Sequence, residues 1–152
     1  MENIIIAPHP DDEIIGMYEV LIKEKCTIFY TEPINEVRRR EAEILKFCEL
    51  VGNQYFSDNI PGEMEARFYF PDPYFETHPA HRKWGAIGER MLRMGYDVIF
   101  YSTQMSAPYI HEVKESDKKM DLLNMIYSSQ KSLWEYDHRY FLFEGRCQWI
   151  IK

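Results

Sequence analysis

The order of hydrophobic patterns along the chain restricts the folds that it can adopt. Residues 3–7 form a continuous apolar run that ends before Pro8, which is typical of a buried parallel strand. Residues 12–25 then repeat apolar side chains at helical spacing, and residues 26–30 return to the pattern of a strand. The chain therefore opens with a predicted β-α-β unit.

The alternation of strand and helix patterns continues through the rest of the chain. Further elements are expected as helices over residues 36–51, 81–94 and 114–127, as strands over 53–56, 67–70 and 97–103, and as a terminal hairpin or pair of edge strands over 139–143 and 148–151. In the helix at 36–51 the apolar stripe is expected to include Val37, Ile44, Leu45 and Phe47. Strands that alternate with helices predict an α/β chain with a three-layer Rossmann-like fold and a mostly parallel sheet.

Length, charge and cysteine content narrow the class of protein. With 152 residues, of which 45% are hydrophobic, the chain is expected to form a single domain over residues 1–152. The net charge of -7 argues against nucleic acid as a partner, because duplex binding needs clustered Lys and Arg. No apolar run approaches the ~18 residues of a membrane span, and the three cysteines form no CxxC pair. We therefore expect a soluble, cytoplasmic protein of undetermined oligomeric state.

A dense group of candidate metal ligands follows the first predicted strand. The run Pro8-His9-Pro10-Asp11-Asp12-Glu13 combines an imidazole with three carboxylates on backbone stiffened by two prolines. Ligands of an open α/β sheet bind beyond the carboxyl ends of its strands, and these donors suit Zn²⁺ or another divalent transition metal. The alternative is structural, with the two aspartates capping the next helix and Pro-His-Pro forming a rigid turn.

The same run resembles the signature of a known family. Ala7-Pro8-His9-Pro10-Asp11-Asp12-Glu13 is similar to the strand-PHPDDE-helix motif of the PIG-L/LmbE-like N-acetylglucosaminyl deacetylases. Three further stretches follow in that family's order. They are Arg40-Glu41-Ala42-Glu43, similar to its R-x-x-E helix, His78-Pro79-Ala80-His81-Arg82, similar to its HPDH segment, and Tyr127-Ser128-Ser129-Gln130, similar to its late SQ motif. The resemblance implies an LmbE-like fold.

The resemblance also implies a role for individual residues. The residues that would ligate zinc are His9, Asp12 and His81. Asp11 would be the general base, and His78 would polarise the substrate carbonyl or protonate the departing amine. Arg40 would reach the substrate, although an exposed helix arginine paired with a neighbouring Glu is an equally good interpretation of that residue.

The activity implied by the resemblance is removal of an N-acetyl group from an N-acetylglucosamine-type or related amino-sugar conjugate, with release of acetate. Two imidazoles and one carboxylate leave an open zinc position for water, whose pKa falls toward ~7 on a catalytic zinc. Two rival hypotheses remain. One is a metal-dependent hydrolase of another amide or ester, and the other is a non-catalytic domain that binds a metal or small molecule.

Two features of the expected site are not decided by the sequence: the group that supports His78 and the identity of the third metal ligand. Ala80 stands where the family's HPDH segment has an aspartate that supports the first histidine, so His78 is expected to be a weaker acid unless Glu76 or Asp72 takes that place. His111 follows a predicted strand and competes with His81 for the third ligand position. We prefer His81, because the paired histidines precede a helix.

Overall fold

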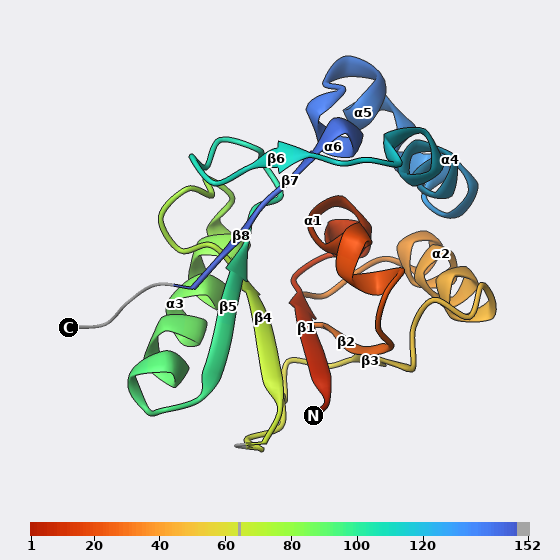
Figure 1. Ribbon diagram of the computed structural model, residues 1–152. Coiled ribbons are helices and arrows are strands. Elements are labelled where there is room, and N and C mark those ends of the chain that lie inside the picture. The colour runs from red at the N-terminus through yellow and green to blue at the C-terminus, as the bar shows by residue number, and fades with distance from the viewer. Residues whose placement is uncertain (64, 149–152) are drawn as a thin grey trace.

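The computed structural model describes residues 1–63 and 65–148, and its main element is one six-stranded sheet (Figure 1). The sheet order is β3-β2-β1-β4-β5-β8, with β8 antiparallel to β5 and the other neighbours parallel. Its strands are β1 (Asn3–Ala7), β2 (Cys26–Tyr30), β3 (Asn53–Phe56), β4 (Arg67–Pro71), β5 (Asp97–Tyr101) and β8 (Arg146–Cys147).

Helices cover both faces of this sheet. On one face α3 (Pro79–Arg93) packs against β4 and β5, and on the other lie α1 (Asp12–Leu21) and α2 (Glu36–Phe47) (Figure 1). The remaining elements are β6 (His111–Glu112), α4 (Ser116–Ile126), the 3₁₀ turn η1 (Ser128–Gln130), α5 (Lys131–Tyr136), α6 (Arg139–Leu142) and β7 (Phe143–Glu144). The predicted three-layer Rossmann-like α/β fold with a mostly parallel sheet is confirmed.

The central strand β1 contributes to the core on both faces of the sheet. Ile5 and Ala7 belong to a cluster with residues of α1, α2 and α4, whereas Ile4 and Ile6 belong to a second cluster with Trp84 of α3. Successive side chains of a strand point to opposite faces. Because both faces are covered, the strand is apolar at consecutive positions and shows no alternation with polar residues.

The predicted terminal hairpin is wrong. Residues 139–142 form α6, since the Asp137 carboxylate accepts the Arg139 N–H at 3.1 Å and so favours a helical turn there. The short strands on either side of Gly145 join different sheets, because β7 pairs with β6 and β8 pairs with β5. Of the second predicted strand, residues 149–151 lie outside the described part of the chain.

The apolar stripe predicted for α2 is wrong in part. The buried residues of this helix are Glu41, Ala42 and Leu45. The exposed apolar residues are Val37, Ile44 and Phe47. The buried face of α2 therefore includes a carboxylate, which the hydrophobic pattern alone does not reveal.

The order of the strands fixes where a ligand would bind. The chain runs outward from β1 through β2 to β3 and then returns to β4 on the other side of β1. Sites of such sheets form at the carboxyl ends of the strands where the order reverses. Here these ends lead into the loops that carry His9 and His78. None of the described helices is long and apolar enough to cross a membrane.

Candidate metal centre

The loop between β1 and α1 holds its polar side chains in defined positions. Asp11 has φ 108°, in the left-handed region that aspartate tolerates better than most residues. Its N–H donates to Glu13 Oε2 at 3.0 Å, and the His9 N–H donates to Asp12 Oδ2 at 2.8 Å. These bonds turn Asp12 toward the His9 ring, whose Nδ1 lies 3.7 Å from Asp12 Oδ2.

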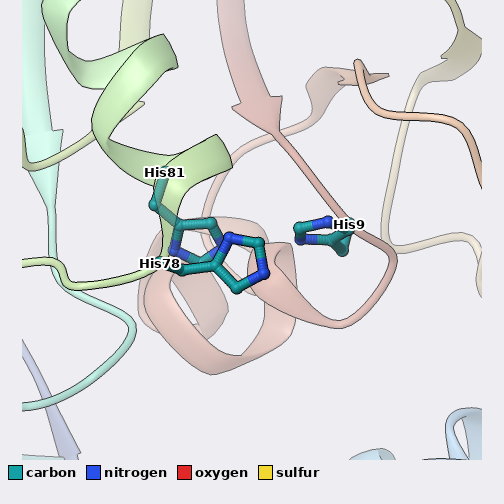
Figure 2. A group of neighbouring side chains, drawn as sticks. All are labelled: His9, His78 and His81. Carbon is teal, nitrogen blue, oxygen red and sulfur yellow. The ribbon is translucent and has the colours of Figure 1, made fainter.

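The start of α3 brings two more imidazoles to the same place. Pro79 occupies the first turn of α3, where its fixed φ suits a helix, and His78 is the N-cap. Figure 2 shows the rings of His9, His78 and His81 grouped together, and each offers a ligand atom within 4.8 Å of the others. The ring centroids of His9 and His78 are 4.8 Å apart, and those of His9 and His81 are 5.6 Å apart.

His81 is oriented from both sides of its ring. Nε2 lies 3.1 Å from Asp12 Oδ2, and Nδ1 lies 3.0 Å from Thr103 Oγ1. Because the Thr103 hydroxyl donates to Glu76 Oε1 at 2.6 Å, it accepts from Nδ1–H of His81. Groups placed behind an imidazole in this way fix its tautomer and leave Nε2 to bind a metal. Sequence reasoning did not identify Thr103.

The ring of His78 is held by backbone. Nδ1 accepts the Ala80 N–H at 3.1 Å, so a neutral His78 carries its proton on Nε2 and presents a donor. The structure places neither expected carboxylate against this ring. Glu76 lies 3.6 Å from Nδ1 of His81, and Asp72 accepts backbone N–H groups of the following turn. The N-cap geometry therefore orients His78 in place of a side-chain carboxylate.

Asp11 is paired with an arginine of α2. Arg38 Nη2 lies 3.2 Å from Asp11 Oδ2, and Arg38 Nε lies 3.8 Å from Glu41 Oε2. Glu41 also accepts from the backbone N and the hydroxyl of Ser129, at 3.0 and 2.7 Å. The R-x-x-E pair that reaches the site is therefore Arg38 with Glu41, and the SQ segment contacts it through Ser129.

The structure places Arg40 outside the site. Its side chain is 71% exposed and lies 2.6 Å from Glu36. Because a helix turns by about 100° per residue, positions 38 and 41 share the buried face with Ala42, whereas position 40 points to solvent. The expected place of Arg40 in the site is therefore wrong, since Arg38 and not Arg40 lines the cavity, and the small apolar Ala42 marks the buried face in the sequence.

Glu13 lies behind the site and is fully buried. One of its oxygens accepts the Asp11 N–H, and the other accepts the Tyr127 hydroxyl. The Tyr127 hydroxyl lies 3.5 Å from that of Tyr30, which accepts from Gln54 Nε2 at 2.8 Å. Burial raises the pKa of Glu13 to about 7, although the bond from Tyr127 opposes this. The network connects the backbone of Asp11 to Tyr127 at the C-cap of α4 and to Tyr30 of β2.

The pKa values of two adjacent carboxylates are shifted in opposite directions. Burial raises the pKa of Asp11 well above its ordinary value, and the charge of Asp12 adds to this, while Arg38 opposes it. Burial also acts to raise the pKa of Asp12, but His81 and His9 outweigh it and lower that pKa. Asp12 is therefore anionic, whereas Asp11 is able to hold a proton. Such separation is typical of groups that carry out acid–base chemistry.

The imidazoles differ as well. Burial opposes protonation of His81, but the charges of Asp12 and Glu76 outweigh it and raise the pKa of His81 to about 10. Burial lowers the pKa of His78, and the neighbouring His81 and His9 lower it further. The anionic carboxylate of Asp12 thus stabilises a positive charge on the neighbouring His81 ring.

The residues present fit a metal ion. His9, Asp12 and His81 supply two imidazoles and a carboxylate, the donor set of open zinc sites, and a cation would replace the positive charge that His81 otherwise carries. The group of three histidines is the other arrangement that the geometry allows. Because Nδ1 of His78 is already an acceptor and its Nε2 carries the proton, His78 suits donation better than ligation.

His111 lies away from this group. It is exposed in β6, and its Nε2 is 2.6 Å from Glu19 Oε1, which also accepts from Arg146 Nη2 at 3.0 Å. Of the two histidines considered for the third ligand position, the structure brings His81 to His9 and Asp12.

A cavity of about 310 Å³ opens over these residues. Its volume is at the small end of the roughly 300–1,000 Å³ that is usual for ligand pockets. Besides the residues described above, the polar lining includes Gln104 and Gln130, and the apolar lining consists of Ile15, Leu133 and Tyr140. Of these five residues, Gln130 belongs to the SQ stretch that the sequence singled out. The sequence does not indicate that Ile15, Gln104, Leu133 and Tyr140 line the cavity, because that depends on how their segments pack over the site.

Comparisons with known proteins support the fold. No protein-family model matches the chain, and no curated protein matches it. Among solved structures it is similar to the conserved protein TT1542 from Thermus thermophilus, with a TM-score of 0.65 at 15% sequence identity over 99% of this chain and 95% of that one. At this identity the likeness shows a shared fold.

Proposed function

We propose that this protein is a zinc-dependent N-deacetylase that acts on an amino-sugar conjugate of the N-acetylglucosamine type and releases acetate. The observation that carries the proposal is the meeting of His9, Asp12 and His81 at the carboxyl edge of the sheet, beside the buried Asp11. The resemblance of the PHPDDE and HPAH stretches to a deacetylase family supports the choice of reaction.

His9, Asp12 and His81 would hold the zinc. When bound, zinc supplies a Lewis acid that polarises a carbonyl oxygen and makes water more acidic. Arg38 lines the same cavity, and the donors of its planar guanidinium would bind a substrate oxygen or anion beside Asp11.

Asp11 is the residue that moves the proton. It accepts a proton from water while the water oxygen bonds to the carbonyl carbon of the acetamide. The C–N bond then breaks, its electron pair goes to nitrogen, and the nitrogen takes a proton, which gives acetate and a free amine. Arg38 holds the carboxylate of Asp11 and Glu13 holds its backbone, so the base is fixed from two sides.

His78 is suited to stabilise the oxyanion. Its Nε2–H is available because the Ala80 N–H occupies Nδ1. A donor that is held in place before the reaction stabilises negative charge as it develops on the carbonyl oxygen. A neutral His78 keeps its Nε2 proton throughout, so the departing amine takes the proton that Asp11 received from water.

The first prediction concerns metal content and turnover. We expect the purified protein to bind one zinc per chain, and His9→Ala, Asp12→Ala and His81→Ala each to lose it, because each removes a ligand. Asp11→Asn should keep the metal, while acetate release from N-acetylglucosamine conjugates falls by at least 10²-fold. Metal analysis and an acetate assay measure both effects.

His111→Ala is the matched control, and we expect it to keep both zinc and activity. Full zinc binding by the His9→Ala/Asp12→Ala double variant would contradict the proposed site. Zinc without hydrolysis of any amide or ester would favour a non-catalytic binding domain. Hydrolysis of other amides or esters, with amino sugars untouched, would favour the broader hydrolase hypothesis.

A further inference from the structure

Part of the cavity wall is apolar. Its members are Ile15 of α1, Leu133 of α5 and Tyr140 of α6. The Ile15 N–H donates to the Asp11 carbonyl oxygen at 2.9 Å, and a helical side chain covers the turn that precedes it. The apolar wall therefore begins directly beside the proposed general base.

The C-terminal helices fix the position of this wall. Trp134, the neighbour of Leu133, is buried, and its Nε1 donates to Asn124 Oδ1 at 2.7 Å. The Tyr140 N–H donates to the Asp137 carbonyl oxygen at 3.3 Å, so the turn that carries Tyr140 follows α5 directly. Leu133 is 39% exposed, so it stands at the rim of the cavity.

We propose that Ile15, Leu133 and Tyr140 bind the acyl group of the substrate and that Leu133 limits this group to a short chain. The inference rests on the proposed function. The carbonyl carbon of an amide carries an oxygen, a nitrogen and a hydrocarbon group. The oxygen and nitrogen need the polar half of the cavity, and the hydrocarbon group is stabilised by leaving water for the apolar half.

The test uses N-acyl glucosamines that carry acetyl, propionyl, butyryl or hexanoyl groups, hydrolysed by the zinc-loaded protein. Leu133→Ala should raise kcat/KM for the butyryl relative to the acetyl substrate by about tenfold, because it removes the side chain that a longer acyl group meets. Leu133→Phe should lower the same ratio. Zinc content equal to that of the wild type shows that each variant is folded.

Leu142→Ala is the control, because Leu142 is similarly exposed on α6 but does not line the cavity. It should leave the ratio unchanged. Equal ratios in the wild type, Leu133→Ala and Leu133→Phe would overturn the acyl site, while acetate release that depends on Asp11 would leave the proposed function standing. If the zinc-loaded wild type hydrolysed no member of the series, the proposed function and the acyl site would both be overturned.

Discussion

Arg38 and Arg40 differ by two positions along one helix and have different environments. The Arg38 side chain is 15% exposed between Asp11 and Glu41, whereas the Arg40 side chain lies in solvent beside Glu36. An exposed ion pair contributes little to stability, but a buried carboxylate that loses its partner is left uncompensated. The two arginines therefore form a natural pair of test and control.

We expect Arg38→Gln to lower the rate of acetate release by about 10²-fold, since Asp11 loses the cation that positions it. Arg40→Gln should leave the rate unchanged. Acetate assays of both variants at equal zinc content make the comparison. A larger loss of activity in Arg40→Gln than in Arg38→Gln would show that α2 is oriented differently.

Only some residues of the candidate site could be placed together from the sequence. His9, Asp11 and Asp12 stand in one short run after an apolar strand, so their convergence follows from chain order alone. The position of Thr103 does not follow from chain order, because Thr103 contacts His81 only when β5 pairs with β4 in the sheet. Arg40 was chosen because Arg40 and Glu43 match the R-x-x-E spacing, but Arg38 and Glu41 match it equally well, and spacing alone does not tell which pair faces inward.

At the scale of elements, α3 approaches the sheet closely where Gly85 faces β4. A Cβ at Gly85 would lie 2.6 Å from the Pro71 carbonyl oxygen and 2.7 Å from Pro73 N, both of which are backbone atoms. No rotation of a side chain relieves such contacts. The glycine therefore fixes how near the helix that carries His78 and His81 lies to the sheet.

We predict that Gly85→Ala lowers the free energy of unfolding by about 1–3 kcal/mol, because α3 must move outward. It should also weaken zinc binding, since His81 moves with the helix. Gly52→Ala is the control, because its added Cβ would lie 3.5 Å from the Cys26 carbonyl oxygen, an ordinary contact. Urea unfolding and zinc titration measure both effects, and equal behaviour of the two variants would contradict the prediction.

The elements that the sequence predicts best are those defined by local pattern. The five parallel strands and the first three helices follow from apolar runs, helical spacing and glycine stops, and the structure has them within a few residues of the predicted bounds. The C-terminal part departs because its short strands are defined by partners in two different sheets. Aromatic residues such as Tyr140 and Phe141 favour a strand locally, but tertiary packing places them in a helical turn.

At the scale of the whole molecule, a buried ion pair between α4 and β7 contacts the backbone of α1, near the start of the chain. Lys119 Nζ donates to Glu144 Oε2 at 2.8 Å and to the Ile15 carbonyl oxygen at 2.6 Å. Glu144 Oε1 accepts the Glu19 N–H at 3.1 Å. Ile15 and Glu19 lie one helical turn apart in α1. The Lys119–Glu144 ion pair therefore hydrogen-bonds to both ends of this turn.

We expect Lys119→Met to lower the free energy of unfolding by about 1.5–3 kcal/mol, since Glu144 loses one charged hydrogen bond and keeps only Arg146 Nη1, at 3.0 Å, as a cationic partner. The neighbouring Lys118→Met should leave the unfolding midpoint unchanged, because that side chain is exposed and pairs with Glu115 at the surface. Thermal unfolding decides between them. Equal midpoints for the two variants would mean that the buried pair contributes no net stability.

The direction of β1 separates the start of the chain from the cavity. The N-terminus lies at the amino end of this strand (Figure 1). The cavity residues His9, Asp11 and Asp12 follow its carboxyl end. Five strand residues at about 3.3 Å each set the two apart by about 16 Å. A biotin or short linker attached at the N-terminus would therefore anchor the molecule to a sensor surface with its cavity mouth open to solution, which suits direct measurement of ligand association.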